Sequence, residues 1–238
     1  MVSQDHREDD KTAYTRRLRR YESDETVVAQ AEDASGRQID FYSPFGPMIA
    51  KLRMPEALVD KLNNYADGVI HRYDQERMAS PAKKPLGEFS LPQKFVFDGG
   101  DQSLASVTEN WIRQYLVTAD DRDAERVRFE MFWMVRHFAG TFSPVHFHSG
   151  AISGIAYLKI PDSISNEAEE EAKSYIGARR AGYITFLIGG KQQYSKSLIS
   201  FKPRVGDFYI FPGWLLHAVE PFEGEGERRS MSFNAFID

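Results

Sequence analysis

The sequence predicts a mainly β domain preceded by two helices. From about residue 127 to the end, short segments rich in β-branched and aromatic residues are separated by Gly, Pro and Asp, which is typical of seven or eight short strands and their turns. Two earlier segments carry apolar residues at helical spacing instead. Strands do not alternate with helices along the chain, so a doubly wound parallel sheet is not expected.

The composition limits the classes of partner. The 238 residues are 42% hydrophobic, which suits one large domain. The net charge is −5 with both signs mixed, and the basic cluster at 16–20 lies between acidic runs, so nucleic-acid binding is not expected. The first residues do not resemble a signal peptide, and no apolar run approaches the ~20 residues that span a bilayer. We therefore expect a cytoplasmic protein without membrane partners.

The elements follow in order along the chain. Residues 1–40 are densely charged and lack an apolar period, so we expect a charged, flexible N-terminal arm ahead of one domain at 41–238. Helices are expected at about 55–75 and 103–119, because apolar residues recur there on one helical face. A charged stretch at 162–181 interrupts the strands, and we interpret it as a surface insertion, with a lid over a site as the alternative.

Two histidines stand one residue apart in the stretch SPVHFHSG. Side chains two residues apart on a strand point to the same face, so His146 and His148 are expected to project together. Pro144 before them and Gly150 after them place the pair near a strand end. Taken alone, the pair also fits two surface histidines.

A third histidine strengthens the case for a metal site. His217 lies after a Pro-Gly turn, at the start of another strand. Two ligands close together on one strand and a third on a distant strand are the layout of a facial metal site that leaves positions open for a substrate. His137 is a weaker candidate, because lone histidines beside a core are more often hydrogen-bonded structural groups. His6 and His71 are expected to be exposed.

The last strand carries an Arg-x-Ser sequence. Alternation places Arg228 and Ser230 on one face, together with Ser232 and Asn234, and turns Arg229 to the other face. A guanidinium and a hydroxyl two residues apart suit the binding of a carboxylate. Gly154 and Gly213 are expected where backbones approach closely, and Phe211 and Trp214 are expected to pack the turn before His217.

Three blocks of the sequence resemble a known family. HFHSGAISGIAYLKIP, GDFYIFPGWLLHAVEP and ERRSMSFN resemble the 2-oxoglutarate- and Fe(II)-dependent oxygenases, and in particular their uncharacterised bacterial and phage branch. The resemblance extends weakly to the segment from Phe45 to Val69. It implies a double-stranded β-helix, or jelly roll, in which the two early segments are supporting N-terminal helices.

The resemblance also implies the cofactors and their ligands. In that family a His-x-Asp/Glu pair and a distal His bind iron, and an Arg-x-Ser binds the far carboxylate of 2-oxoglutarate. His146 and His217 match the two histidines, and Arg228 and Ser230 match the Arg-x-Ser. His148 stands where the carboxylate usually is; a three-His site is chemically sound, but His148 as a non-ligand stays open. Tyr157 and Tyr183 are candidates for a phenol hydrogen bond to the co-substrate or the substrate.

The expected function is therefore an Fe(II)- and 2-oxoglutarate-dependent oxygenase that hydroxylates a small molecule or a side chain. The metal site would use His146, His148 and His217, and the co-substrate site Arg228, Ser230 and Tyr157. Two alternatives remain: a three-His, cupin-like dioxygenase that does not use 2-oxoglutarate, and a metal-binding β-sandwich module without enzymatic activity. Oxygenases of this fold are often dimers, so a homodimer is also an expectation.

Overall fold

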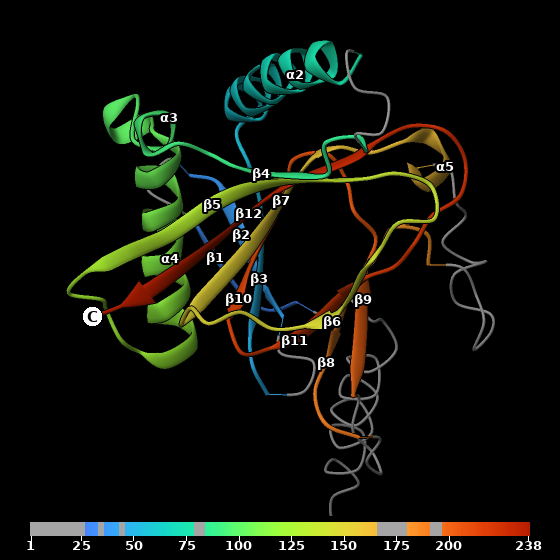
Figure 1. Cartoon of the computed structure of the whole chain (residues 1–238). Coiled ribbons are helices and arrows are strands. Elements are labelled where there is room, and N and C mark those ends of the chain that lie inside the picture. The colour runs from blue at the N-terminus through green and yellow to red at the C-terminus, as the bar shows by residue number, and fades with distance from the viewer. Residues whose placement is uncertain (1–26, 33–35, 43–45, 79–83, 166–179, 191–196) are drawn as a thin grey trace, which may run out of the picture.

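Two antiparallel sheets make up the core of the protein. The structure is a computed structural model, and it describes residues 27–32, 36–42, 46–78, 84–165, 180–190 and 197–238. In this part of the chain, one sheet has eight strands and the other has four, and the two pack against each other (Figure 1). The mainly β class predicted from the sequence is confirmed.

The spatial order of the strands differs from their order along the chain. The larger sheet consists, in spatial order, of β1 (Val27–Glu32), β2 (Gln38–Tyr42), β3 (Ile49–Arg53), β10 (Asp207–Pro212), β7 (Ile152–Lys159), β12 (Arg228–Ile237), β5 (Val127–His137) and β4 (Glu88–Ser90). The smaller sheet consists of β6 (Ser143–His146), β11 (Leu216–Val219), β8 (Ile184–Leu187) and β9 (Leu198–Phe201). Strand β12 therefore has a neighbour on each side in the larger sheet, whereas β6 is at an edge of the smaller one.

Two long helices cover the outer face of the larger sheet. They are α2 (Glu56–Met78) and α4 (Leu104–Asp120), at the positions where apolar periodicity predicts helices (Figure 1). The side chain of Ser103 caps α4 by accepting a hydrogen bond from the backbone N–H of Ser106 at 3.1 Å. Short turns of helix add α3 (Gln93–Val96), η1 (Gly100–Gln102) and α5 (Asp162–Ser165). Among the residues described, no helix is long and apolar enough to cross a membrane.

Alternation along the central strands divides the interior into two cores. Met231 and Phe233 on β12 face α2 and α4, as do Phe208 and Ile210 on β10. Residues of opposite parity, such as Tyr157 on β7, pack toward the smaller sheet. On β12 the residues of that parity are Arg228, Ser230, Ser232 and Asn234, all buried and all polar. The space between the sheets is thus apolar near β8 and β9 and polar beside β12.

The expected boundary at residue 40 does not match the start of the sheet. Strands β1 and β2 lie before or across it, and β2 pairs with β3 through Ile39 opposite Leu52. Ile39 is fully buried in the core under the helices. Strand β1 is short, its sequence is VVAQAE, and it lies within a densely charged stretch, which explains the misplaced boundary. Residues 1–26 of the expected arm, and residues 166–179 of the expected insertion, lie outside the described part of the chain.

A buried ionic network fixes the start of β12. Glu227 accepts hydrogen bonds from Nε of Arg229 at 2.7 Å and from Nε of Arg136 at 2.8 Å. Arg229 also reaches helix α2, where its Nη2 contacts Asp67 at 2.7 Å and its Nη1 contacts Asn63 at 3.0 Å. Burial would raise the pKa of Glu227, but the two arginines outweigh it and hold the pKa below the ordinary 4.5.

We expect Glu227→Gln to destabilise the fold at neutral pH by about 2 to 4 kcal/mol, because two buried guanidinium groups lose their counter-charge. A carboxylate whose folded-state pKa is depressed contributes stability above its unfolded-state pKa and loses it as the pH falls through the folded-state pKa. The difference from wild type should therefore shrink below about pH 4.5. Chemical denaturation across this pH range measures it. Glu225→Gln, at an exposed site two residues earlier, is the control, and an equal loss there would contradict the prediction.

Candidate active site

Three histidines meet between the two sheets. His146 ends β6, His148 follows two residues later, and His217 lies on β11 directly opposite His146. One ring nitrogen from each lies within 4.8 Å of the others. The structure thus brings together the three side chains that the sequence predicts as metal ligands.

Backbone carbonyl groups orient two of the rings. Nδ1 of His146 is 2.7 Å from the carbonyl oxygen of Pro144, and Nδ1 of His217 is 2.8 Å from that of Leu215. A carbonyl only accepts, so Nδ1 of each neutral ring carries the proton and Nε2 presents a lone pair to the cluster. Metal-binding histidines are held in this way by an outer hydrogen bond on the second nitrogen.

The spacing of the nitrogens fits one first-row metal ion. Nε2 of His148 lies 3.2 Å from Nε2 of His217. If each nitrogen were about 2.1 Å from a shared ion, the angle at the ion would be about 100°, between octahedral and tetrahedral values. An all-imidazole donor set suits iron, zinc, copper or nickel rather than magnesium or calcium. The residues present therefore fit a transition-metal cofactor.

Burial keeps two of these imidazoles neutral. It lowers the pKa of His148 to about 4, with a smaller contribution from the neighbouring His146. It lowers the pKa of His217 to about 3, against a small opposing effect of the hydrogen bond to Leu215. Aromatic rings pack beside them: the ring of Trp133 is centred 5.5 Å from that of His148, and the ring of Phe211 is centred 5.0 Å from that of His217. At neutral pH these rings do not have to lose a proton before binding a metal.

The main chain clamps the segments that carry the histidines. The N–H of His148 donates to the carbonyl oxygen of Gly213 at 2.8 Å, and the N–H of Gly213 donates to that of Ala151 at 2.9 Å. A β-carbon on Gly213 would lie 2.0 Å from the carbonyl oxygen of Gly150, so only glycine fits this approach. A β-carbon on Gly154 would lie 2.3 Å from the ring of Phe233, so this position is equally restricted to glycine. Both expectations of close backbone approach are confirmed.

The expectation about the turn before His217 is half right. Phe211 is 1% exposed and packs on His217, whereas Trp214 is 56% exposed. Trp214 directly follows Gly213 in the turn, and its ring lies largely in solvent. The sequence does not reveal this exposure.

A cavity of about 350 Å³ adjoins the histidine cluster. Its wall includes the three histidines, His137, and three polar residues of β12, which are Ser230, Ser232 and Asn234. Met131, Trp133 and Val135 of β5 form an apolar side. The alternation predicted for the last strand therefore holds, because its polar face lines the cavity.

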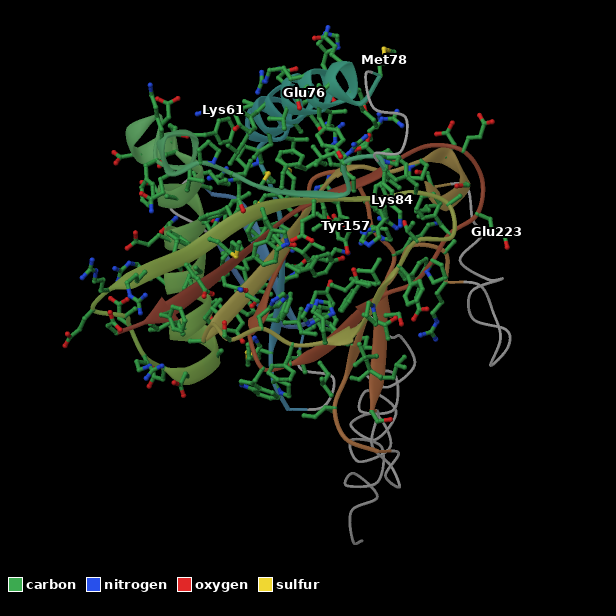
Figure 2. All side chains as sticks on the ribbon, in the orientation of Figure 1. Lys61, Glu76, Met78, Lys84, Tyr157 and Glu223 are labelled. Carbon is green, nitrogen blue, oxygen red and sulfur yellow. The ribbon has the colours of Figure 1, made fainter. Side chains whose placement is uncertain are left out.

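Arg228 is fully buried beside this cavity. Its Nε donates to the carbonyl oxygen of Gly182 at 3.1 Å, its Nη1 to Nδ1 of His137 at 3.2 Å, and its Nη2 to the hydroxyl of Tyr157 at 3.1 Å. Figure 2 shows Tyr157 in the interior of the molecule, whereas the labelled residues of α2 lie at its periphery. Arg228 and Tyr157 do not line the cavity surface themselves; their cavity-lining neighbours are His137 and Ser230.

Two polar groups next to the cavity have unused hydrogen-bonding capacity. Among the described residues, the hydrogen-bond partners of Arg228 are all neutral and none is a carboxylate, and burial lowers the pKa of its guanidinium. Ser230 Oγ is buried and has no hydrogen-bond partner in the described part of the chain. Burial raises the pKa of Tyr157, so its hydroxyl stays protonated. Donors without an acceptor, next to an unpaired cation, suit an anionic ligand.

Arg229 points away from the cavity, as alternation predicts, but its surroundings differ from those of a solvent-facing side chain. Helix α2 covers it, and it is 2% exposed in the network with Glu227 and Asp67. Of the other histidines, His71 is exposed on α2, as expected, and His6 lies outside the described residues.

The sequence indicates a structural role or a weak metal-binding role for His137. The structure gives this residue a specific place beside Arg228. It is opposite Arg228 in the β5–β12 register and 6% exposed, and it reaches Ser143 Oγ with Nε2 at 3.1 Å. It is not part of the three-histidine cluster that fits a metal. Only the register of two strands that are distant in the sequence could have indicated this contact.

Comparison with known proteins shows which family this region is similar to. A family model described as "Putative 2OG-Fe(II) oxygenase" matches residues 131–234. The match covers somewhat less than half of the chain and shows that this region is similar to the 2OG-Fe(II) oxygenase family. The matched region contains every predicted site residue of the oxygenase. This match supports the expected enzyme class and its cofactors, Fe(II) and 2-oxoglutarate, over the two alternatives, and it points to a small-molecule or side-chain substrate. No curated protein matches the sequence.

Several solved structures are similar to this chain. SnoK, a non-heme alpha-ketoglutarate-dependent carbocyclase from nogalamycin biosynthesis, is 11% identical over 83% of this chain and 81% of its own, with a TM-score of 0.51. A prolyl-4-hydroxylase from Pseudomonas putida is 14% identical over 82% and 94% of the two chains (TM-score 0.46). A 2OG-Fe(II) oxygenase family oxidoreductase from Burkholderia pseudomallei is 11% identical over 52% of this chain and 50% of its own (TM-score 0.35). At this identity, the similarity to SnoK shows a shared fold, the double-stranded β-helix.

We expect Gly213→Ala to weaken metal binding by the oxygenase at least tenfold, because the added methyl displaces the backbone that anchors His148. Metal titration followed by fluorescence or calorimetry measures the affinity. Gly87→Ala, where a β-carbon would meet no atom within 4 Å, is the control. Unchanged metal affinity in Gly213→Ala would show that this clamp does not govern the site.

Proposed function

We propose that the protein hydroxylates an organic substrate with Fe(II) held by His146, His148 and His217 and with 2-oxoglutarate anchored by Arg228. One observation carries the proposal. Three imidazoles line the cavity, and a buried guanidinium without a carboxylate partner in the described residues lies directly behind its wall, in contact with the cavity-lining His137. Bound Fe(II) would supply the activation of oxygen that couples oxidation of 2-oxoglutarate to oxidation of the substrate.

The hydrogen-bond count at Arg228 supports binding of the far carboxylate. A guanidinium has five N–H donors, and Arg228 uses three of them for Gly182, His137 and Tyr157. The two left over, one on each terminal nitrogen, suit a bidentate contact with a carboxylate. The hydroxyl of Ser230 adds another donor from the same strand face. A carboxylate would also remove the cost of an uncompensated buried charge.

Tyr157 is a second residue of the proposed 2-oxoglutarate site, next to Arg228. Its oxygen accepts from Nη2 of Arg228, so its own proton is available for an oxygen of the co-substrate. The guanidinium carbon also lies 4.8 Å from the centre of the phenol ring, which adds a cation–π contact. Tyr157 therefore both holds the arginine and extends its row of donors. Tyr183 is buried elsewhere in the fold and does not line the cavity.

His148 in place of a carboxylate changes the charge of the site. Three neutral ligands leave the full positive charge of the metal, one unit more than a two-His-one-carboxylate set. With the cation of Arg228, this favours a dianionic co-substrate such as 2-oxoglutarate. The role of His148 is to donate a lone pair, while its contact with Trp133 limits rotation of the ring.

The remaining cavity wall is proposed to receive the substrate. Met131, Trp133 and Val135 offer an apolar surface, and Ser232, Asn234 and Glu88 offer polar contacts. The amide of Asn234 is oriented by Ser153, whose hydroxyl donates to its oxygen at 2.8 Å. A small molecule, or a side chain projecting from a larger one, fits this wall. Cytoplasmic location stays part of the proposal on the basis of the sequence composition, and a homodimer because oxygenases of this fold are often dimers. Light scattering after size exclusion tests the dimer.

The test of the function is spectroscopic and chemical. Under anaerobic conditions, Fe(II) and 2-oxoglutarate together should give a weak visible charge-transfer band that neither gives alone, because both bind at one metal. With oxygen, the protein should then release succinate. Absence of the band with bound Fe(II) would contradict the proposal and favour a metal site without 2-oxoglutarate.

Substitutions of His148 test whether this residue is a metal ligand. We expect His148→Ala to lower Fe(II) affinity by a factor of ten or more, and His148→Asp to keep measurable affinity because a carboxylate also binds Fe(II). His71→Ala, at an exposed position on α2, is the control. Fe(II) binding at wild-type strength in His148→Ala would exclude His148 from the ligand set.

Arg228→Ala should weaken 2-oxoglutarate binding about thirtyfold or more, since a buried charge-assisted contact is worth about 2 to 5 kcal/mol. Fe(II) binding should hardly change. Arg229→Ala is the neighbouring comparison: it should lower the melting temperature, because it breaks the contacts with Glu227 and Asp67, yet leave 2-oxoglutarate affinity near wild type. If Arg229→Ala weakens 2-oxoglutarate binding and Arg228→Ala does not, Arg229 rather than Arg228 is the anchor.

A further inference from the structure

His137 occupies a position between the two halves of the proposed site. It is the last residue of β5 and is paired with Arg228, the first residue of β12. Its side chain is buried yet lines the cavity. Its two ring nitrogens contact different sheets: Nδ1 is 3.2 Å from Nη1 of Arg228, and Nε2 is 3.1 Å from the hydroxyl of Ser143 on β6.

The chemistry of the partners decides which nitrogen carries the proton. A guanidinium only donates, so Nδ1 of His137 must accept from Arg228. The ring is then neutral, and Nε2–H donates to Ser143 Oγ. Burial, with a smaller contribution from the charge of Arg228, lowers the pKa of His137 to about 4, in agreement with a neutral ring. The direction of this hydrogen-bond chain is therefore fixed, from Arg228 through His137 to Ser143.

This chain of hydrogen bonds connects Arg228, the proposed anchor of the co-substrate, with strand β6, which carries the proposed metal ligand His146. Ser143 begins β6, which ends at His146. On the other side, Arg228 has no carboxylate partner among the described residues, so neutral acceptors alone determine how its planar fork is turned. Of these, His137 holds Nη1 and Tyr157 holds Nη2, and each terminal nitrogen keeps one further N–H.

We propose that His137 is a positioning residue for 2-oxoglutarate: by accepting from Nη1, it turns the guanidinium of Arg228 so that the remaining N–H groups meet the far carboxylate. This inference rests on the proposed function. It assigns to His137 a role in selecting a dicarboxylate, without any direct contact with the metal. Its effect should appear in the preference for an acid that has the far carboxylate over one that lacks it.

Two amide substitutions separate the ring nitrogens. In His137→Asn the amide oxygen takes roughly the place of Nδ1 and keeps an acceptor for Arg228. In His137→Gln the longer side chain places its amide near Nε2, which favours Ser143 and withdraws the acceptor from Arg228. Both variants are polar and of similar size, so a general effect on folding should be the same in the two.

The experiment measures dissociation constants by calorimetry on the anaerobic Fe(II)-loaded protein, for 2-oxoglutarate and for 2-oxopentanoate, which has the same carbon chain without the far carboxylate. The ratio of the two constants is the preference for the dicarboxylate. We expect His137→Gln to lower this preference about tenfold, as for a lost hydrogen bond to a charged group, and His137→Asn to keep it within about threefold of wild type. The affinity for 2-oxopentanoate should change little in either variant.

Wild type and Arg228→Ala distinguish the two levels of the proposal. If wild type shows no preference for 2-oxoglutarate, or Arg228→Ala retains it, the proposed function fails and this inference fails with it. If wild type prefers 2-oxoglutarate and Arg228→Ala does not, but His137→Gln keeps the preference or the Asn and Gln variants lose it equally, His137 does not position the arginine and only this inference is overturned.

Discussion

Strand β12 has to satisfy two opposite environments, and the rest of the site follows from this constraint. Successive side chains of a strand point to opposite faces, so one sequence of ten residues supplies both an apolar surface for the helices and a polar wall for the cavity. Its neighbours β5 and β7 hold it on both sides. A slip by one residue would bury Arg229 in the cavity and expose the core side chains to it.

The two adjacent arginines show how the strand resists such a slip. Arg229 is neutralised by Glu227 and Asp67, and these contacts fasten the beginning of β12 to helix α2. Arg228, next to it, is held by neutral acceptors only. One charge therefore fixes the register, while the other stays available for a ligand. The same strand thus places a fully paired guanidinium beside one that keeps spare donors.

Local sequence patterns predict the parts of the site that depend on alternation or on spacing within a segment. The same-face pair His146 and His148, the opposed directions of Arg228 and Arg229, and the two long helices are of this kind. The features that the sequence does not predict depend on register or on packing between distant segments. Strands β1 and β2 acquire their role by pairing, the burial of Arg229 requires α2, and the contact of His137 with Arg228 requires the β5–β12 register. The family match agrees with the class inferred from the motifs, while the assignment of roles to individual residues rests on the geometry of the cavity.

The close contact between Gly213 and Gly150 has a consequence for metal selection. Because peptide groups rather than long side chains set the spacing around His148, the three imidazoles of the proposed metal site are in place before any ion arrives. A rigid cage of three nitrogen donors follows the general affinity order of first-row divalent ions, which places nickel, copper and zinc above iron. Selectivity for iron must then come from the supply of metals around the protein and from the anionic co-substrate. Purified material would accordingly contain whichever of these ions was most accessible during its synthesis.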